Sequence, residues 1–147
     1  PDWMRSIDAI DYFADFYKDF DKAKAQDMVI KFGLDPRQKL KTMSKGTKEK
    51  VQLILTMSRD VNLYILDEPI GGVDPAARDY ILNTIINNYK EDATVIISTH
   101  LINDVEPVLN HIIFLKEGVV VRQGDVDDIR EETGMSIDAL FREEFKC

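Results

Sequence analysis

The chain has 147 residues, of which 44% are hydrophobic, enough for a compact domain with a sizeable core. Its 27 Asp and Glu residues against 19 Lys and Arg give a formal net charge of −8, which argues against nonspecific binding to DNA or RNA. No apolar run approaches the roughly 20 residues of a membrane-spanning helix, no signal peptide is visible, and the single Cys147 excludes a disulfide framework or a cysteine metal site.

The first part of the chain is predicted to be helical. A helix capped by Ser6 should reach about Phe20, and a second helix, over 22–32, should follow the cap residue Asp21. A third helix is expected over 47–58. The first helix carries five aromatic residues at helical spacing, which are Tyr12, Phe13, Phe16, Tyr17 and Phe20.

The middle of the chain alternates strand with helix. Two short apolar runs without alternation, 63–66 and 94–98, predict strands that are buried on both faces. Between them, Asp74 and Pro75 predict a helix start, and this helix should reach about Tyr89. The order strand, helix, strand, helix implies an α/β fold with a mainly parallel sheet covered by helices.

A hairpin and two acidic helices are predicted at the end of the chain. The helix before the hairpin should end or kink at Pro107. The runs 112–115 and 119–121 flank a Lys-Glu-Gly turn, which is typical of a hairpin. Of the two closing helices, one follows Asp125 and the other is capped by Ser136.

Two adjacent carboxylates, Asp67 and Glu68, follow the first buried strand. The carboxyl ends of parallel strands are where such sheets bind ligands. Successive strand side chains point in opposite directions, so one acid can hold Mg²⁺ while the other polarises an attacking water. A solvated strand end before a turn is the plain structural alternative, and Pro69 would supply that turn.

Other segments fit a phosphate site only in combination. His100 follows the second strand and could contact a γ-phosphate, although a lone histidine there is more often structural. Residues 43–47 precede a helix, so that backbone N–H groups, a hydroxyl and a lysine could bind an anion; an ordinary helix cap is the alternative. Asp74 likewise needs no role beyond capping its helix.

In this order, these segments resemble the ATP-binding cassette (ABC) ATPases. Met-Ser-Lys-Gly-Thr at 43–47 is similar to the signature motif, usually Leu-Ser-Gly-Gly-Gln. Tyr-Ile-Leu-Asp-Glu at 64–68 resembles the Walker B strand and the glutamate after it. Gly-Val-Asp at 72–74 resembles the D-loop, and His100 the switch histidine. The resemblance covers nearly the whole chain and implies a P-loop NTPase-like fold.

The resemblance implies that two nucleotide-binding domains face each other with two ATP molecules between them. Asp67 would support Mg²⁺, Glu68 would activate the attacking water and His100 would contact the γ-phosphate. Asp74 would link the two sites across the dimer. Hydrolysis would then separate the halves and move an attached permease.

The signature motif departs from the usual one. Ser44 and Gly46 would bind the γ-phosphate held by the opposite domain. Lys45 and Thr47, in the same loop, replace a glycine and the final glutamine. A cation at position 45 is compatible with phosphate binding, and the resemblance relates it to family members that drive integral-membrane exporters.

A larger departure is that no Gly-x-x-x-x-Gly-Lys-Ser/Thr loop appears in the chain. The glutamine loop that contacts the permease is absent too. We therefore expect a part of a longer protein that binds ATP very weakly and does not hydrolyse it alone. By resemblance, 1–60 is a helical subdomain with the signature, 61–124 a portion of the ATPase core and 125–147 the C-terminal helices.

Three functions remain open from the sequence. The first is a transporter ATPase subunit, peripheral on the cytoplasmic face of the membrane, with a second nucleotide-binding domain and a transmembrane permease as partners. The second is a non-transport ABC ATPase that acts on DNA or ribosomes, which the acidic balance opposes. The third is a non-catalytic regulatory domain, which the altered signature would suit.

Overall fold

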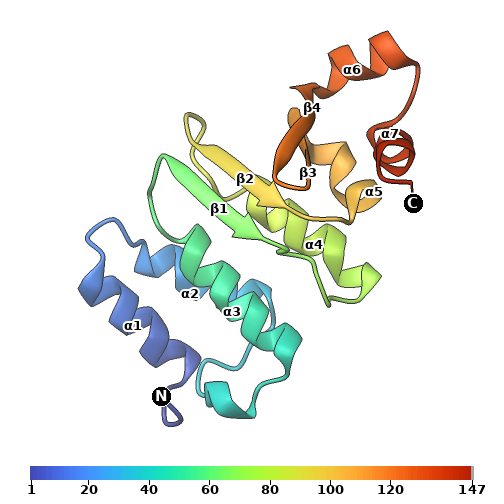
Figure 1. Cartoon of the computed structure of the whole chain (residues 1–147). Helices are drawn as coiled ribbons and strands as arrows, with labels where there is room; N and C mark the ends of the chain where they lie inside the picture. The colour runs from blue at the N-terminus through green and yellow to red at the C-terminus, as the bar shows by residue number, and fades with distance from the viewer. Residues whose placement is uncertain (147) are drawn as a thin grey trace. The chain divides into compact units, whose positions relative to one another are not determined.

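The structure is a computed structural model that describes residues 1–146, so Cys147 lies outside the described residues. The chain divides into two compact units, the first of which is Pro1–Ser98, and the second begins at Thr99. Each unit has its own helices and strands (Figure 1). Within residues 1–146, no helix has the length and apolar character needed to span a bilayer.

Three helices that pack on one another form the front of the first unit, followed by strand, helix and strand. Ser44 caps the third helix, so this helix starts two residues before its predicted start. In chain order the elements are α1 (Ser6–Phe16), α2 (Lys22–Lys31), the short 3₁₀ turn η1 (Leu40–Thr42), α3 (Lys45–Met57), β1 (Leu63–Asp67), α4 (Pro75–Ile86) and β2 (Thr94–Ser98).

Helix α1 differs from its prediction at both ends. Arg5, not Ser6, is the residue before the first turn, because the Asp8 carboxylate accepts the Arg5 backbone N–H at 2.8 Å. Ser6 is itself buried inside the helix. At the other end Tyr17 is extended, and Phe20 forms an isolated bridge with Arg59. This tertiary pairing ends the helix at Phe16, four residues before the predicted end.

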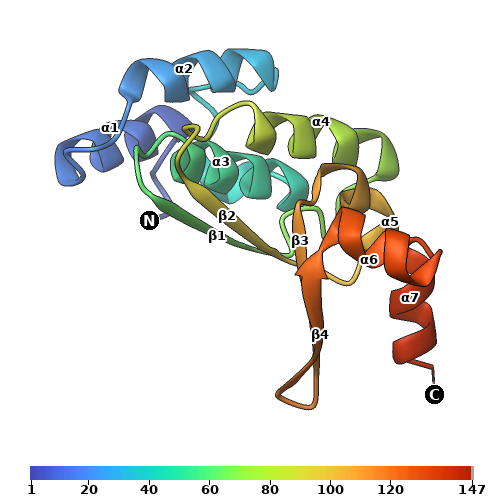
Figure 2. The same cartoon turned by 90° about the horizontal axis from the view of Figure 1, so that it is seen from above.

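The parallel pairing of β1 and β2 confirms the predicted parallel strands. Leu63 pairs with Thr94 and Asp67 with Ser98 in an unbroken register. Helix α4 connects them and ends at Ile86, three residues before the predicted end. Figure 2 shows α3 and α4 on one side of this strand pair.

The prediction that both strands are buried on both faces is wrong. Burial alternates along β1, where Tyr64 is buried and Ile65 is 67% exposed. Ile96 on β2 is 49% exposed, and no residue of β2 is fully buried. The cause is that the described residues of this unit put helices on one face only, so the apolar side chains of the other face stay open.

The second unit is a hairpin covered by short helices. It contains α5 (Ile102–Val105), the 3₁₀ turn η2 (Glu106–Val108), β3 (His111–Lys116), β4 (Val119–Asp125), α6 (Val126–Thr133) and α7 (Ile137–Glu144). Pro107 ends α5 as expected, and Ser136 caps α7. The antiparallel hairpin confirms the predicted turn, with Glu117 and Gly118 at positive φ. Its core is built from Ile102, Ile112, Phe114, Val126, Ile129, Ile137 and Leu140.

Candidate functional site

Asp67 is the last residue of β1, and its exposed carboxylate lies on the open face of the strand pair. The Ser98 hydroxyl, on the neighbouring strand, donates a hydrogen bond to Asp67 Oδ1. The two residues are register partners, so their side chains emerge from the same face at the same height. The predicted carboxylate therefore has a defined polar neighbour.

Glu68 lies just beyond the strand, in an unusual backbone conformation. Its φ is +45°, a region that non-glycine residues rarely adopt and that is often found at functional sites. The Glu68 N–H donates to the Ser98 carbonyl at 2.8 Å, and its own carbonyl accepts from Gly71 N–H at 3.0 Å. Because Glu68 has left the strand, the simple alternation predicted for the two acids stops at Asp67.

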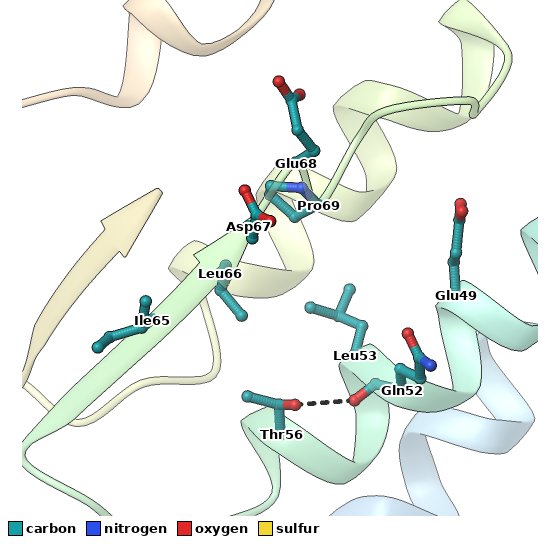
Figure 3. A pocket seen from close by; sticks show the side chains of 9 residues that line it. All are labelled: Glu49, Gln52, Leu53, Thr56, Ile65, Leu66, Asp67, Glu68 and Pro69. Carbon is teal, nitrogen blue, oxygen red and sulfur yellow. Dashed lines mark hydrogen bonds between the residues drawn. The ribbon is translucent and has the colours of Figure 1, made fainter. Parts of the chain in front are cut away.

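A hollow of about 260 Å³ lies between the end of β1 and helix α3. Its polar wall is formed by Asp67 and Glu68 from the strand end and by Glu49, Gln52 and Thr56 from α3 (Figure 3). Figure 3 also shows Leu66 pointing to the opposite side from the two acids, toward the helix. Leu66 thus lies on the helix side of the strand end, while the two acids contribute to the polar wall of the hollow.

The signature residues lie at the start of α3. The Ser44 hydroxyl accepts the Thr47 backbone N–H at 3.2 Å and lies 2.8 Å from the Thr47 hydroxyl. The Lys45 side chain is 85% exposed, with its Nζ 4.0 Å from a Glu49 carboxylate oxygen. Gly46 has open space around the position of a Cβ atom. Hydroxyls, a cation and a helix start therefore occur together, the combination that suits an anion.

The loop after Glu68 approaches the signature within the same unit. Lys45 Nζ is 3.8 Å from where a Cβ atom on Gly72 would lie. Gly72 has a φ of +72°, so a side chain there would also be strained. Asp74 then caps α4 by accepting the Ala76 N–H at 3.0 Å. The structure thus brings the signature lysine next to the loop that leads to Asp74.

His100 lies two residues after the end of β2, as the sequence indicated. It belongs to the second compact unit, whereas Asp67 and Glu68 belong to the first. The histidine is exposed. Its predicted contact with a phosphate near the two acids stays a prediction.

Asp67 and Glu68 can bind Mg²⁺ only if a nucleotide supplies further ligands to the ion. Within residues 1–146, no group of three or more His, Cys, Asp or Glu side chains is placed to hold a metal. Mg²⁺ commonly takes one or two carboxylates and completes its shell with water and substrate phosphates. The exposed Asp67 carboxylate suits that arrangement.

Sequence reasoning assigned no role to Ser98, which the structure places against Asp67. The sequence contains one signal for it, because each strand is a short apolar run that ends in a polar residue, Asp67 or Ser98, so the two ends should align. What the sequence does not contain is the register that pairs them.

Known proteins similar to this chain are ATP-binding proteins. Residues 2–103 match the family profile described as “AAA domain, putative AbiEii toxin, Type IV TA system”. The ABC transporter ATP-binding protein YtrB of Bacillus subtilis is 27% identical over 84% of this chain and 42% of its own length. The ABC-type transporter ATP-binding protein EcsA of the same organism is 36% identical over 66% of this chain and 39% of its own length.

A solved structure described as the ATP-binding subunit of an ABC transporter aligns with 99% of this chain and 64% of its own. The TM-score is 0.84 and the identity 26%. The chain therefore spans less than half of the two curated relatives and about two thirds of the solved structure. The likeness in fold extends through both compact units, although it says nothing of the part of those proteins that has no counterpart here.

Proposed function

The chain belongs to the AAA-domain family and, by its relatives and its fold, to the ABC ATPases. From this premise we propose that it supplies part of the ATP-binding and ATP-hydrolysing subunit of an ABC transporter. The observation that carries this proposal is the acidic end of β1, where Asp67 is the last strand residue, Glu68 follows it, and both are hydrogen-bonded to Ser98. The carboxyl ends of parallel strands are the usual place for a nucleotide site in such folds.

In this proposal the two acids have different tasks. Asp67 would hold Mg²⁺, directly or through water, and the ion would neutralise charge on the phosphates when bound. Glu68 would accept a proton from the attacking water. The different backbone settings of the two residues support this division, because Asp67 ends a regular strand and Glu68 has a positive φ. His100 would contact the γ-phosphate.

The signature would act on a nucleotide held by a second nucleotide-binding domain. Ser44, Lys45, Gly46 and Thr47 would bind its γ-phosphate, which the exposed lysine and the hydroxyls at the α3 start support. Asp74 would connect the two sites across the dimer. Asp74 lies two residues after Gly72, and Gly72 lies beside Lys45 of the signature, which supports such a connection.

A transmembrane permease is the proposed second partner, with this subunit on the cytoplasmic face of the membrane. Support comes from α1, where Tyr12 and Phe16 stack on each other and are 56% and 67% exposed. Their neighbours Phe13, Tyr17 and Phe20 are partly buried in ring contacts. The aromatic stripe thus serves packing on one side and leaves two rings on the surface.

The test is Glu68→Gln in the intact ATPase subunit with its partners. Loss of the general base should reduce ATP hydrolysis by roughly 10²–10⁴-fold while ATP still binds. Glu91→Gln, the same substitution at an exposed position outside the hollow, is the matched control and should leave hydrolysis in place. The 147-residue chain alone should not turn over Mg-ATP, since it has no Gly-x-x-x-x-Gly-Lys-Ser/Thr loop. Turnover by this chain alone that is lost on Glu68→Gln would contradict the proposal of a partial site.

Co-purification of the intact subunit tests the transport role. Recovery with an integral membrane protein supports a transporter subunit. Recovery with ribosomes or DNA would favour the non-transport alternative, and intact protein without any ATPase activity would favour the regulatory one.

A further inference from the structure

We infer that Ser98 is a positioning residue for the Asp67 carboxylate and thereby for divalent-cation binding in the proposed ATPase site. This inference rests on the proposed function, since it concerns the same acids. Ser98 closes β2, and its hydroxyl donates to Asp67 Oδ1. Its carbonyl also accepts the Glu68 N–H at 2.8 Å. One residue therefore holds both acids, one through its side chain and one through its backbone.

The direction of the Ser98–Asp67 bond follows from the chemistry of the two groups. An ionised carboxylate only accepts hydrogen bonds, so the serine hydroxyl must be the donor. The hydroxyl proton then points at Oδ1 and occupies one lone pair of that oxygen. Oδ2 is left for other ligands. Ser98 thus fixes the orientation of the carboxylate, while Oδ2 and the second lone pair of Oδ1 remain able to bind a cation.

The strand register fixes this contact without help from a loop. Five consecutive residue pairs join β1 and β2, from Leu63 with Thr94 to Asp67 with Ser98. In a parallel pair with a two-residue repeat, the register partners at the end of one face are brought side by side. The intervening pair on that face, Ile65 and Ile96, is apolar and offers Asp67 no hydrogen bond. The serine is therefore the donor that the register supplies.

The functional consequence concerns the metal more than the nucleotide. Groups that hydrogen-bond a metal-binding carboxylate orient it, and their loss typically costs about 10–100-fold in metal affinity or activity. Without the hydroxyl, the Asp67 side chain can rotate about its terminal torsion. The backbone bond from Glu68 to Ser98 does not involve the side chain, so removal of the hydroxyl leaves the Glu68 position in place.

The test compares Ser98→Ala and Ser98→Thr in the intact ATPase subunit. Mn²⁺ serves as the probe, and its binding in the presence of a non-hydrolysable ATP analogue is measured by electron paramagnetic resonance. Ser98→Ala should weaken Mn²⁺ binding by about 10–100-fold. Ser98→Thr keeps a hydroxyl and should restore it. Affinity for the analogue in EDTA should be equal in all variants, a result that a general loss of structure would not give.

Thr94→Ala is the matched control, because Thr94 lies on the same face of the same strand but pairs with Leu63. It should bind Mn²⁺ as the wild type does. Equal Mn²⁺ affinity in Ser98→Ala and wild type would overturn the inference while the proposed function stands. Failure of Ser98→Thr to restore binding, with normal affinity in EDTA, would overturn it as well. A wild-type subunit that binds no Mn²⁺ with the analogue would overturn both proposals.

Discussion

The Asp8 carboxyl group has a pKa that its contacts in the structure lower clearly. Its carboxylate accepts from the Arg5 guanidinium at 2.8 and 2.9 Å and from the Arg5 backbone N–H at 2.8 Å. The guanidinium hydrogen bonds, followed by the backbone one, lower the pKa of Asp8 from 3.8 to about 2. This contact replaces the serine cap that the sequence suggested at the start of α1.

The pKa of Asp8 makes the start of α1 sensitive to acid. Because the folded pKa lies below the ordinary one, the stabilising contribution is present above pH 3.8 and is lost as the pH falls toward 2. An NMR titration of the Asp8 carboxyl carbon should give a midpoint near 2. Arg5→Ala should move it back toward 3.8, and an unchanged midpoint in that variant would contradict the assigned cause.

Among the site residues, those that mark an element's end could be predicted and those that depend on pairing could not. Asp67 and Glu68 follow an apolar run, and Asp74 and Ser44 cap helices, so local sequence indicates them. Ser98 meets Asp67 across 31 residues of chain. That contact depends on the register of two strands, and the positive φ of Glu68 depends on the tight turn to Gly71.

At the scale of elements, Glu106 fastens the helices of the second unit together. Its carboxylate accepts from Arg130 Nη2 at 2.8 Å and from the backbone N–H groups of Ile137 and Asp138 at 2.9 and 3.0 Å. Burial alone would raise the pKa of Glu106, but Arg130 and the two N–H groups together hold it below its ordinary value. The residue thus joins η2, α6 and the start of α7.

Glu106→Ala should destabilise this unit by about 3 kcal/mol, because it leaves Arg130 and two N–H groups without their acceptor. Denaturant unfolding followed on α6 and α7 measures the change. The loss should be smaller below pH 4.5, since the lowered pKa of Glu106 means that its contribution is present above that pH and fades below it. Glu131→Ala, an exposed glutamate on α6, should change stability by less than about 0.5 kcal/mol.

The elements themselves were largely predictable, and their ends less so. Asp21, Asp74 and Ser136 cap the helices expected of them, because a cap is a local hydrogen bond. The end of α1 could not be predicted, because Phe20 lies outside the helix and forms a bridge with Arg59, which is distant in the sequence. Tertiary contacts of this kind override local helical spacing.

At the scale of the whole molecule, the α/β class followed from the alternation of strand and helix, and the parallel pair confirms it. The division of the chain at 60 and 124 stays a prediction. The main error of the sequence prediction concerned the burial of β1 and β2. An apolar run indicates that a strand can be buried, but it does not indicate which elements cover the strand. Ile65 and Ile96 show the difference, since both are apolar and both are exposed.

The open face of β1 and β2 has a practical consequence for handling the chain by itself. Among residues 1–146 the outer edges of β1 and β2 have no further strand partner, and an apolar strand surface with open edges favours association between chains, so we expect concentrated samples to aggregate. Replacing Ile65 and Ile96 together by Thr should raise the concentration at which light scattering begins. Ile30→Thr, a change at a 76% exposed residue on a helix, should not. If light scattering begins at the same concentration in both variants, the surface that causes aggregation lies elsewhere on the chain. If only the double variant raises the onset, the face that carries Asp67 at its polar end limits the solubility of the chain through the apolar residues along the rest of its length.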